Sequence, residues 1–447
     1  MKITLPMDVK FIINRLNNHG YEAFAVGGCI RDSILCFTPK DWDICTDADP
    51  NRILDCFTEL KTIHTGIKYG TVSVVLNDKT YDVTTYRTDG IYSDNRHPDR
   101  VVFIKSLKED LSRRDFTINA MAYNDRDGFI DYFEGENDVY DKIIRCVGKC
   151  LKRFEEDALR ILRALRFAAT YNFTIEINTH YAIIGKKELL RNLHPQRIRE
   201  ELNKLLLCKG VEEILLQYSL VLAVVIPEIE PAIGYNQNNP YHIYDVWEHT
   251  VKSIAFSNDD LIVRLTMLLH DLSKAICYKN NTASSGYFYN HAVKSAEIAK
   301  QILERLKYDN DTIYNVYKLI FYHDTKISPD RIQIKRWLKK LGIQTFFRLL
   351  EVKKADAKAQ NPLYLEKRLE TYDKIFKQTN IILNQNLCFQ LKDLNINGKD
   401  IILLGYKQGK EVGNILEYLL NLVIEEKVEN KKNILIEEVK RLKKNKT

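Results

Sequence analysis

Residues 26–46 of the chain read VGGCIRDSILCFTPKDWDICT. The apolar run that ends in Gly27-Gly28 predicts a strand followed by a turn where backbone N–H groups can approach a ligand such as a triphosphate. Asp41 and Asp43 show the alternation of a second strand, so both carboxylates are expected on one face. Taken alone, a tight turn and a solvated acidic strand end explain these features as well.

Two carboxylates that face the same way repel each other, and a pair of Mg²⁺ ions with nucleotide phosphates would relieve that repulsion. Asp82, on a later predicted strand, fits either a general base for an attacking hydroxyl or an edge-strand charge. In residues 110–123, Arg114 offers forked donors for phosphate and Asp115 an acceptor for a ribose hydroxyl. A basic surface turn would also explain that segment.

Short apolar runs alternate with turn residues between residues 21 and 131, which predicts an α+β head. After Arg145 the chain changes to long periodic stretches rich in Leu, Ile, Glu, Lys and Arg, which predict helices up to the C-terminus. Residues 227–242 gather Pro, Gly and Asn and predict a connection between two helical units.

A chain of 447 residues is longer than a single hydrophobic core usually supports, so several domains are expected. A net charge of +7 mildly favours a polyanionic partner without identifying one. Nine scattered cysteines fit reduced thiols. The start lacks the apolar core of a signal peptide, and no apolar stretch could span a bilayer, so we expect a cytoplasmic protein with no membrane partner.

Residues 153–173, RFEEDALRILRALRFAATYNF, predict one amphipathic helix. On such a helix Arg160 lies about 60° from Asp157, with Arg163 at about 120° and Arg166 at about 180°. A helix of this kind could simply bury its Leu/Ile/Phe stripe and solvate its arginines.

The order GG-x-x-RD, D-x-D and RRDFTINA (residues 113–120) resembles the class II tRNA nucleotidyltransferases and bacterial poly(A) polymerases of the polymerase-β-like superfamily. The RRDFTINA match is long and specific. The resemblance implies that Gly28 and Arg31 cradle the triphosphate, that Asp41 and Asp43 bind the metals, that Arg114 contacts the nucleotide, and that Asp115 is a ribose partner.

The segment E-D-x-L-R-x-L-R-A-x-R-F, residues 156–167, is similar to the nucleotide-recognition signature of the same family. The resemblance implies that Asp157 and Arg160 pair with the Watson–Crick edge of CTP or ATP, as carboxylate and guanidinium groups can. Arg163 would reach phosphate or base. Arg166 lies on the opposite side of the predicted helix from Asp157, so its geometry makes it the weakest candidate for a nucleotide contact. A later motif, HPQRIREELNKLLL, implies that Arg197 and Glu201 brace the recognition helix.

Histidines recur beside carboxylates between residues 241 and 330, and such clusters are more often metal ligands than isolated histidines are. The series resembles the HD phosphohydrolase superfamily, although Ser273 replaces a glycine that is frequent there. Phosphatase or cyclic phosphodiesterase action on damaged 3′ ends is one expectation, and a packing role is the other. The implied ligands of a second divalent metal are His249, His270, Asp271 and Asp324, with His291 next.

The leading expectation is template-independent addition of CCA to the 3′ end of tRNA from CTP and ATP with Mg²⁺. Residues 87–103 look like the flexible loop of complete CCA-adding enzymes, which disfavours a CC-adding enzyme. Partial addition, poly(A) synthesis and an HD phosphohydrolase with an RNA-gripping head remain alternatives. The expected architecture is an α+β nucleotidyltransferase head (1–145), a helical neck (146–230), an HD-type helical domain (231–335) and a tRNA-binding helical tail (336–447).

Overall fold

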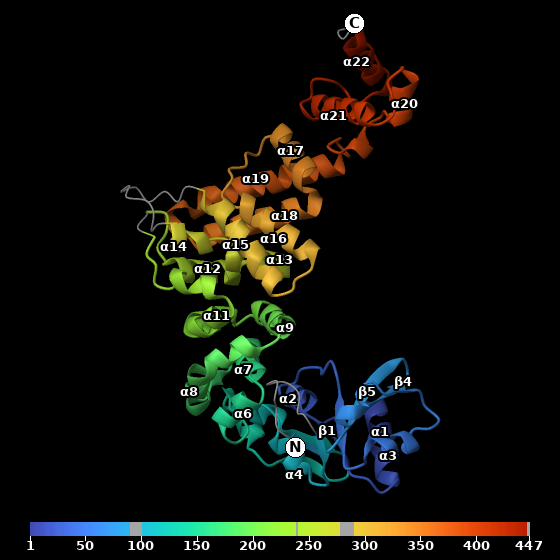
Figure 1. Cartoon of the computed structure of the whole chain (residues 1–447), viewed down its shortest axis with the longest axis vertical. Helices are drawn as coiled ribbons and strands as arrows, with labels where there is room; N and C mark the ends of the chain where they lie inside the picture. Colours follow the sequence, from blue (N-terminus) through green and yellow to red (C-terminus); the bar gives the residue numbers. More distant parts are fainter. Residues whose placement is uncertain (90–100, 238–239, 278–289, 445–447) are drawn as a thin grey trace. The chain divides into compact units, whose positions relative to one another are not determined.

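A computed structural model of the chain describes residues 1–89, 101–237, 240–277 and 290–444 (Figure 1). The chain separates into two compact units, Met1–Glu230 and Pro231–Thr447. The division falls inside residues 227–242, where Pro, Gly and Asn gather. The finer division into four domains remains a prediction.

The first unit begins with a seven-stranded mixed sheet in the order β3-β4-β5-β2-β1-β8-β9. Strand β2 pairs antiparallel with β1 and parallel with β5, so it lies at the middle of the sheet. This confirms the predicted α+β head. The strands are β1 (Ala23–Val26), β2 (Asp43–Thr46), β3 (Thr62–Ile63), β4 (Thr71–Leu76), β5 (Lys79–Thr85), β8 (Met121–Asn124) and β9 (Gly128–Asp131), and the head helices are α1 (Met7–Asn18), α2 (Gly28–Ile34), α3 (Pro50–Cys56), α4 (Leu107–Ser112) and α5 (Gly135–Tyr140).

The hairpin stem formed by β6 (Arg87–Asp89) and β7 (Val101–Phe103) is antiparallel. The rest of the loop that was predicted over residues 87–103 lies outside the described residues. Its comparison with the flexible loop of complete enzymes therefore remains a prediction.

The neck is helical, but the single helix predicted over residues 153–173 is wrong. Asp157 has extended backbone angles (φ −142°, ψ 102°) and separates α6 (Cys150–Glu156) from α7 (Leu159–Tyr171). Its carboxylate accepts a hydrogen bond from Leu159 N at 3.0 Å, as Asp side chains do at helix starts. Helical angles therefore do not relate Asp157 to the arginines of α7.

Four further helices complete the first unit, together with a small parallel pair of strands that the helical prediction after Arg145 missed. These strands are β10 (Ile143–Ile144) and β11 (Thr174–Ile175), and the helices are α8 (Ile177–Lys186), α9 (Pro195–Leu206), α10 (Val211–Gln217) and α11 (Ser219–Val225).

The second unit is helical in its described part. Helix α13 is buried along most of its length, including Val263, Leu265 and Leu268, so the residues that follow it lie in the interior. No described helix is long and apolar enough to cross a membrane. The helices are α12 (Val246–Phe256), α13 (Leu261–Leu269), α14 (Leu272–Cys277), α15 (His291–Arg305), α16 (Asn310–Tyr322), α17 (Arg331–Leu341), α18 (Ile343–Lys358), α19 (Leu365–Asn384), α20 (Gly398–Leu403), α21 (Lys410–Ile424) and α22 (Lys432–Lys444).

Candidate active site and metal centre

Three carboxylates gather at the centre of the head sheet. Asp43 is the first residue of β2, and the parallel register Ile44–Val83 places Asp82 of β5 level with it. Asp41 lies two residues before the strand begins. The predicted strand through both Asp41 and Asp43 therefore includes only Asp43. Ser73 on β4 donates a hydrogen bond from Oγ to Asp82 Oδ1 at 2.5 Å, which fixes that carboxylate.

The charges around Asp43 make this cluster attractive to a cation. Partial desolvation by the surrounding protein raises the pKa of Asp43 above its ordinary value, Arg114 opposes that rise, and the carboxylates of Asp82 and Asp41 add to it. Repulsion among carboxylates is relieved when a divalent ion binds, and carboxylate oxygens are ligands that Mg²⁺ prefers. The donor set therefore fits magnesium.

The glycine turn brings backbone close to Arg114. Gly27 has φ +87°, and a Cβ there would lie 3.0 Å from Nη1 of Arg114. Only glycine combines that left-handed conformation with so close an approach. Gly28 is the first residue of α2. The structure thus places Arg114 between the glycine turn and Asp43.

Arg31 and Asp115 belong to one buried network. Asn119 accepts a hydrogen bond from Arg31 Nη1 and donates from Nδ2 to Asp115 Oδ1 at 3.0 Å. Arg163 of α7 donates to Asp115 Oδ2 from Nε at 2.8 Å and from Nη2 at 2.6 Å. Burial raises the pKa of Asp115, but Arg163 and Asn119 outweigh it and hold that pKa well below its usual range.

The Arg31 guanidinium also stacks over the ring of Tyr171, 4.5 Å from its centroid. The network ties the glycine-turn helix α2 to helix α7. The two carboxylate oxygens of Asp115 already accept hydrogen bonds from protein groups, and its role as ribose partner remains a prediction.

The predicted bracing by the later neck motif is confirmed. Arg197 of α9 donates to both oxygens of Asp157, at 3.2 and 3.0 Å. One turn further along α9, Glu201 accepts from Arg166 Nε at 2.6 Å. Arg166 therefore braces α7 against α9, and its role as a nucleotide contact remains a prediction.

Arg160 is buried at the junction of α6 and α7. It donates from Nη1 to Glu156 Oε2 at 2.8 Å and from Nη2 to the carbonyl oxygen of Arg113 at 3.0 Å. These bonds fix the guanidinium between the recognition segment and the RRDFTINA segment.

In the second unit, imidazole rings converge on a buried point. In three of the rings, Nδ1 lies within hydrogen-bond distance of a backbone carbonyl oxygen, at 3.0 Å for His249, 2.7 Å for His270 and 2.6 Å for His323. A carbonyl only accepts, so Nδ1 carries the hydrogen, and in the neutral ring Nε2 presents a lone pair. This second bond orients histidines that ligate metals.

The Nε2 atoms form two close pairs. His249 and His270 bring theirs to 3.3 Å, and His291 and His323 do the same. Two nitrogens bound to one tetrahedral metal at about 2.0–2.1 Å lie about 3.4 Å apart. Asp271 stands between the pairs, with Oδ2 at 3.5 and 3.2 Å from the first pair and Oδ1 at 3.6 and 3.7 Å from the second.

A second carboxylate, Asp356 of α18, completes the first pair. Its Oδ1 lies 3.0 Å from Nε2 of His249 and 3.7 Å from Nε2 of His270. The prediction of Asp324 as a ligand is wrong, because its side chain is exposed while the preceding His323 points into the cluster.

The electrostatics of this cluster favour a cation. Burial lowers the pKa of His270, but the carboxylates of Asp271 and Asp356 outweigh burial and raise that pKa to about 10. Lys274 Nζ lies 2.6 Å from Asp271 Oδ2, yet neither oxygen of Asp271 makes a well-aligned hydrogen bond with any residue that the structure describes. Mixed imidazole and carboxylate donors suit a transition metal, and the residues fit one.

Several members of these sites escaped the sequence reasoning. Asn119 lies inside RRDFTINA, but no pattern shows that it bridges two buried charges. His323 directly precedes Asp324 but was not predicted as a ligand, and Asp356 lies in KKADAK, far from any histidine in sequence. Histidine spacing could have found His323, whereas Asp356 needed the packing of α18 against α12 and α13.

Three family models match the chain. Residues 23–145 match the poly A polymerase head domain, residues 172–233 match the RNA and SrmB-binding site of polymerase A, and residues 287–439 match tRNA nucleotidyltransferase domain 2. The head combines a mixed sheet with a cluster of three carboxylates, and a helical neck follows it. Together with the matching family models, these features define a nucleotidyltransferase with a head of the poly A polymerase type.

Similarity to individual proteins shows which kind of nucleotidyltransferase the chain resembles. The CCA-adding enzyme of Ligilactobacillus salivarius is 31% identical over 440 residues, which span 96% of this chain and 95% of that protein. The CCA-adding enzyme of Lactobacillus delbrueckii is 46% identical over 198 residues, 44% of this chain and half of that protein. The crystal structure of the Bacillus stearothermophilus CCA-adding enzyme in complex with CTP has a TM-score of 0.70 at 26% identity and 99% coverage of both chains.

The chain belongs to the family of CCA-adding enzymes, the class II tRNA nucleotidyltransferases that its motifs resemble. Its head and helical remainder follow the fold of that family.

Proposed function

We propose that this protein adds CCA to the 3′ end of tRNA, using CTP twice and then ATP and releasing pyrophosphate at each step. The observation that carries the proposal is the similarity to a CCA-adding enzyme over nearly the whole of both chains. The cytoplasm is the proposed place of action, since that is where tRNA ends would be matured.

The head residues are proposed to hold the reacting groups. Asp41 and Asp43 would bind magnesium, which supplies charge neutralisation at the phosphates and activation of the attacking hydroxyl when it is bound. Asp82, fixed by Ser73, accepts the proton of the tRNA 3′-hydroxyl. Arg114 and the backbone at Gly28 orient the triphosphate, so that positioning and charge carry most of the catalysis.

The neck residues are proposed to read the base. Asp157 accepts from the exocyclic amino group of cytosine or adenine, and Arg160 donates to a ring or carbonyl acceptor. The bonds from Arg197 hold the Asp157 carboxylate in place, and Glu156 holds Arg160. A rigid pair of this kind accepts CTP and ATP and rejects the opposite pattern of UTP and GTP.

The test incubates the protein with tRNA that lacks its last three nucleotides, one labelled nucleoside triphosphate at a time and together, and magnesium. We expect growth by three nucleotides ending in CCA. An open-ended A tail would indicate poly(A) synthesis instead, a stop after two C residues would indicate partial addition, and no incorporation would refute all three.

The base-reading proposal predicts that Asp157→Ala lowers the preference for CTP and ATP over UTP and GTP. A well-placed pair contributes about 1–3 kcal/mol of base discrimination, so we expect a loss of roughly tenfold to a hundredfold in the ratio of kcat/KM values. The measurement is single-nucleotide incorporation with each of the four triphosphates. Unchanged selectivity in a variant that still incorporates would remove Asp157 from base reading.

A second candidate function is supported by the buried cluster of the helical unit. We infer that His249, His270, Asp271 and Asp356 hold a divalent transition metal, with Asp271, His291 and His323 beside a second position. Asp271 then joins both positions through its two oxygens. Such centres support hydrolysis of phosphate esters, and damaged RNA 3′ ends are the proposed substrate.

This second function is tested with short RNAs that end in a 3′-phosphate or a 2′,3′-cyclic phosphate, supplied with Mn²⁺, Ni²⁺ or Zn²⁺. We expect conversion to a 3′-hydroxyl or to a monophosphate in the wild type and loss of that conversion in Asp271→Asn. CCA addition should continue in the variant. Bound metal without hydrolysis of either end would leave the cluster as a structural metal site.

A further inference from the structure

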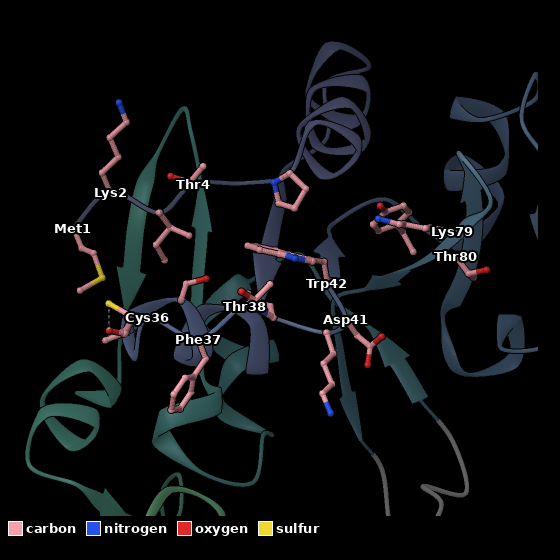
Figure 2. A pocket seen from close by; sticks show the side chains of 17 residues that line it. Met1, Lys2, Thr4, Cys36, Phe37, Thr38, Asp41, Trp42, Lys79 and Thr80 are labelled. Carbon is pink, nitrogen blue, oxygen red and sulfur yellow. Dashed lines mark hydrogen bonds between the residues drawn. The ribbon is translucent and has the colours of Figure 1, made fainter.

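A cavity of about 1080 Å³ opens in the head beside Asp41 (Figure 2). Its wall comes from the N-terminal residues before α1, from the connection between α2 and β2, and from the start of β5. Asp41 belongs to both the cavity wall and the carboxylate cluster. The glycine turn, Arg114 and the neck arginines do not line it, so the nucleotide-binding role leaves this space unexplained.

Aromatic rings and cationic side chains share the wall. Phe37 is 57% exposed, and the half-buried Trp42 follows Asp41 in the chain, with its ring directed away from the Asp41 carboxylate (Figure 2). Lys2, Lys40 and Lys79 are exposed. Within residues 1–89, 101–237, 240–277 and 290–444, none of these three ammonium groups has a carboxylate within 4.0 Å.

The contrast with the neck identifies the kind of ligand. There, the arginine that is proposed to read the base, Arg160, is held by the carboxylate of Glu156 at 2.8 Å. Held guanidinium groups suit a ligand with one fixed shape. Unpaired lysines on flexible stems suit phosphates whose positions vary, and exposed rings stack on any base. Together they fit a single RNA strand that is bound without regard to sequence.

The direction of attack agrees with this ligand. In an in-line displacement the attacking oxygen and the leaving pyrophosphate lie on opposite sides of the α-phosphate. The glycine turn that is proposed to cradle the triphosphate begins α2, whereas Ser33 and Ile34 at the other end of α2 line the cavity. A strand in the cavity would therefore approach Asp41 from the side away from the leaving group.

We propose that this cavity receives the single-stranded 3′ end of the RNA primer, with Trp42 and Phe37 against its bases and Lys2, Lys40 and Lys79 at its phosphates. The proposal rests on the nucleotidyltransferase function above and adds the path by which the 3′-hydroxyl reaches Asp41. None of the five residues touches the reacting atoms, so each acts by positioning the primer.

The test compares two triple variants of the full chain. Lys2→Ala/Lys40→Ala/Lys79→Ala removes the three cavity lysines. Lys61→Ala/Lys108→Ala/Lys142→Ala removes three exposed lysines of the same unit that do not line the cavity, and so loses the same charge. Binding of tRNA lacking CCA is measured by filter retention without nucleotide over a range of salt, and incorporation is measured with saturating CTP.

The cavity variant should bind this RNA about tenfold more weakly at physiological salt, and the slope of log affinity against log salt should shrink by roughly two to three. KM for the RNA should rise by the same factor, while KM for CTP and kcat at saturating RNA stay within twofold. Trp42→Leu, which keeps an apolar side chain, should weaken RNA binding several-fold at an unchanged salt slope.

Equal RNA affinity in the two triple variants, or a raised KM for CTP in the cavity variant alone, would overturn the proposal. The result that would refute the RNA path differs from the result that would refute the transferase function. A wild-type protein that binds RNA through the cavity lysines but incorporates no nucleotide would refute the proposed transferase function and leave the RNA path standing.

Discussion

The molecule contains two acidic clusters that differ in almost every respect. In the head, Asp41, Asp43 and Asp82 are solvent-exposed and offer oxygen atoms only. In the helical unit, Asp271 is 1% exposed and stands among imidazole nitrogens that are oriented by backbone carbonyls. The first cluster is open and short of ligands, so nucleotide phosphates must complete it. The second, called closed because it is buried, offers enough protein ligands to hold a metal without substrate.

The largest effect should come from the open cluster. Asp43→Asn removes a charge that we propose to bind magnesium at the reacting phosphate, and incorporation should fall by at least about 1,000-fold, or ~4 kcal/mol. The measurement is the rate of CTP incorporation into tRNA lacking CCA, with bound transition metal determined on the same sample.

Because the two clusters are independent, metal content should be unchanged in Asp43→Asn. Asp55→Asn is the matched control, since it changes an exposed acid of α3 in the same head and should incorporate CTP normally. Incorporation within tenfold of the wild type in Asp43→Asn would show that this carboxylate is not part of the catalytic centre.

Sequence patterns predicted the open cluster better than the closed one, for a physical reason. The head carboxylates lie on or beside short strands with period-two alternation, and sheet register then brings Asp43 and Asp82 together. Ligands of the closed cluster come from five helices and their ends. Helical periodicity shows which face of a helix is apolar, but it does not say which helices pack together.

Asp356 and Asp324 illustrate that limit. Asp324 follows a histidine and looks like part of an HD pair, yet it is exposed. The ligand position is filled instead by Asp356 near the end of α18. Asp157 shows another limit. The Leu/Arg periodicity runs through it without interruption, and only its extended backbone and the bond to Leu159 N reveal a break between two helices. A local hydrogen bond between the Asp157 side chain and the backbone prevailed there over periodicity.

The smallest effect, and the sharpest test of the comparison, concerns metal removal. A ligand that binds only the folded state stabilises it by about 2.7 kcal/mol at a hundred times its Kd, which for a unit of this size corresponds to a Tm shift of about 5–10 °C. A transition-metal chelator should lower the Tm of the wild type by that amount, and Zn²⁺, Mn²⁺ or Ni²⁺ should restore it. Excess Mg²⁺ should not, because imidazole nitrogens are poor magnesium ligands.

Asp271→Asn provides the control for that experiment. It removes the carboxylate that faces both imidazole pairs, so its Tm should no longer respond to the chelator, whereas Asp43→Asn should respond as the wild type does. If the wild type contained no transition metal by elemental analysis and its Tm ignored both chelator and added ions, the buried cluster would be held together by shared protons. The head cluster would then still be a magnesium-binding catalytic site, but the buried cluster would be only a packed part of the core and not a metal site.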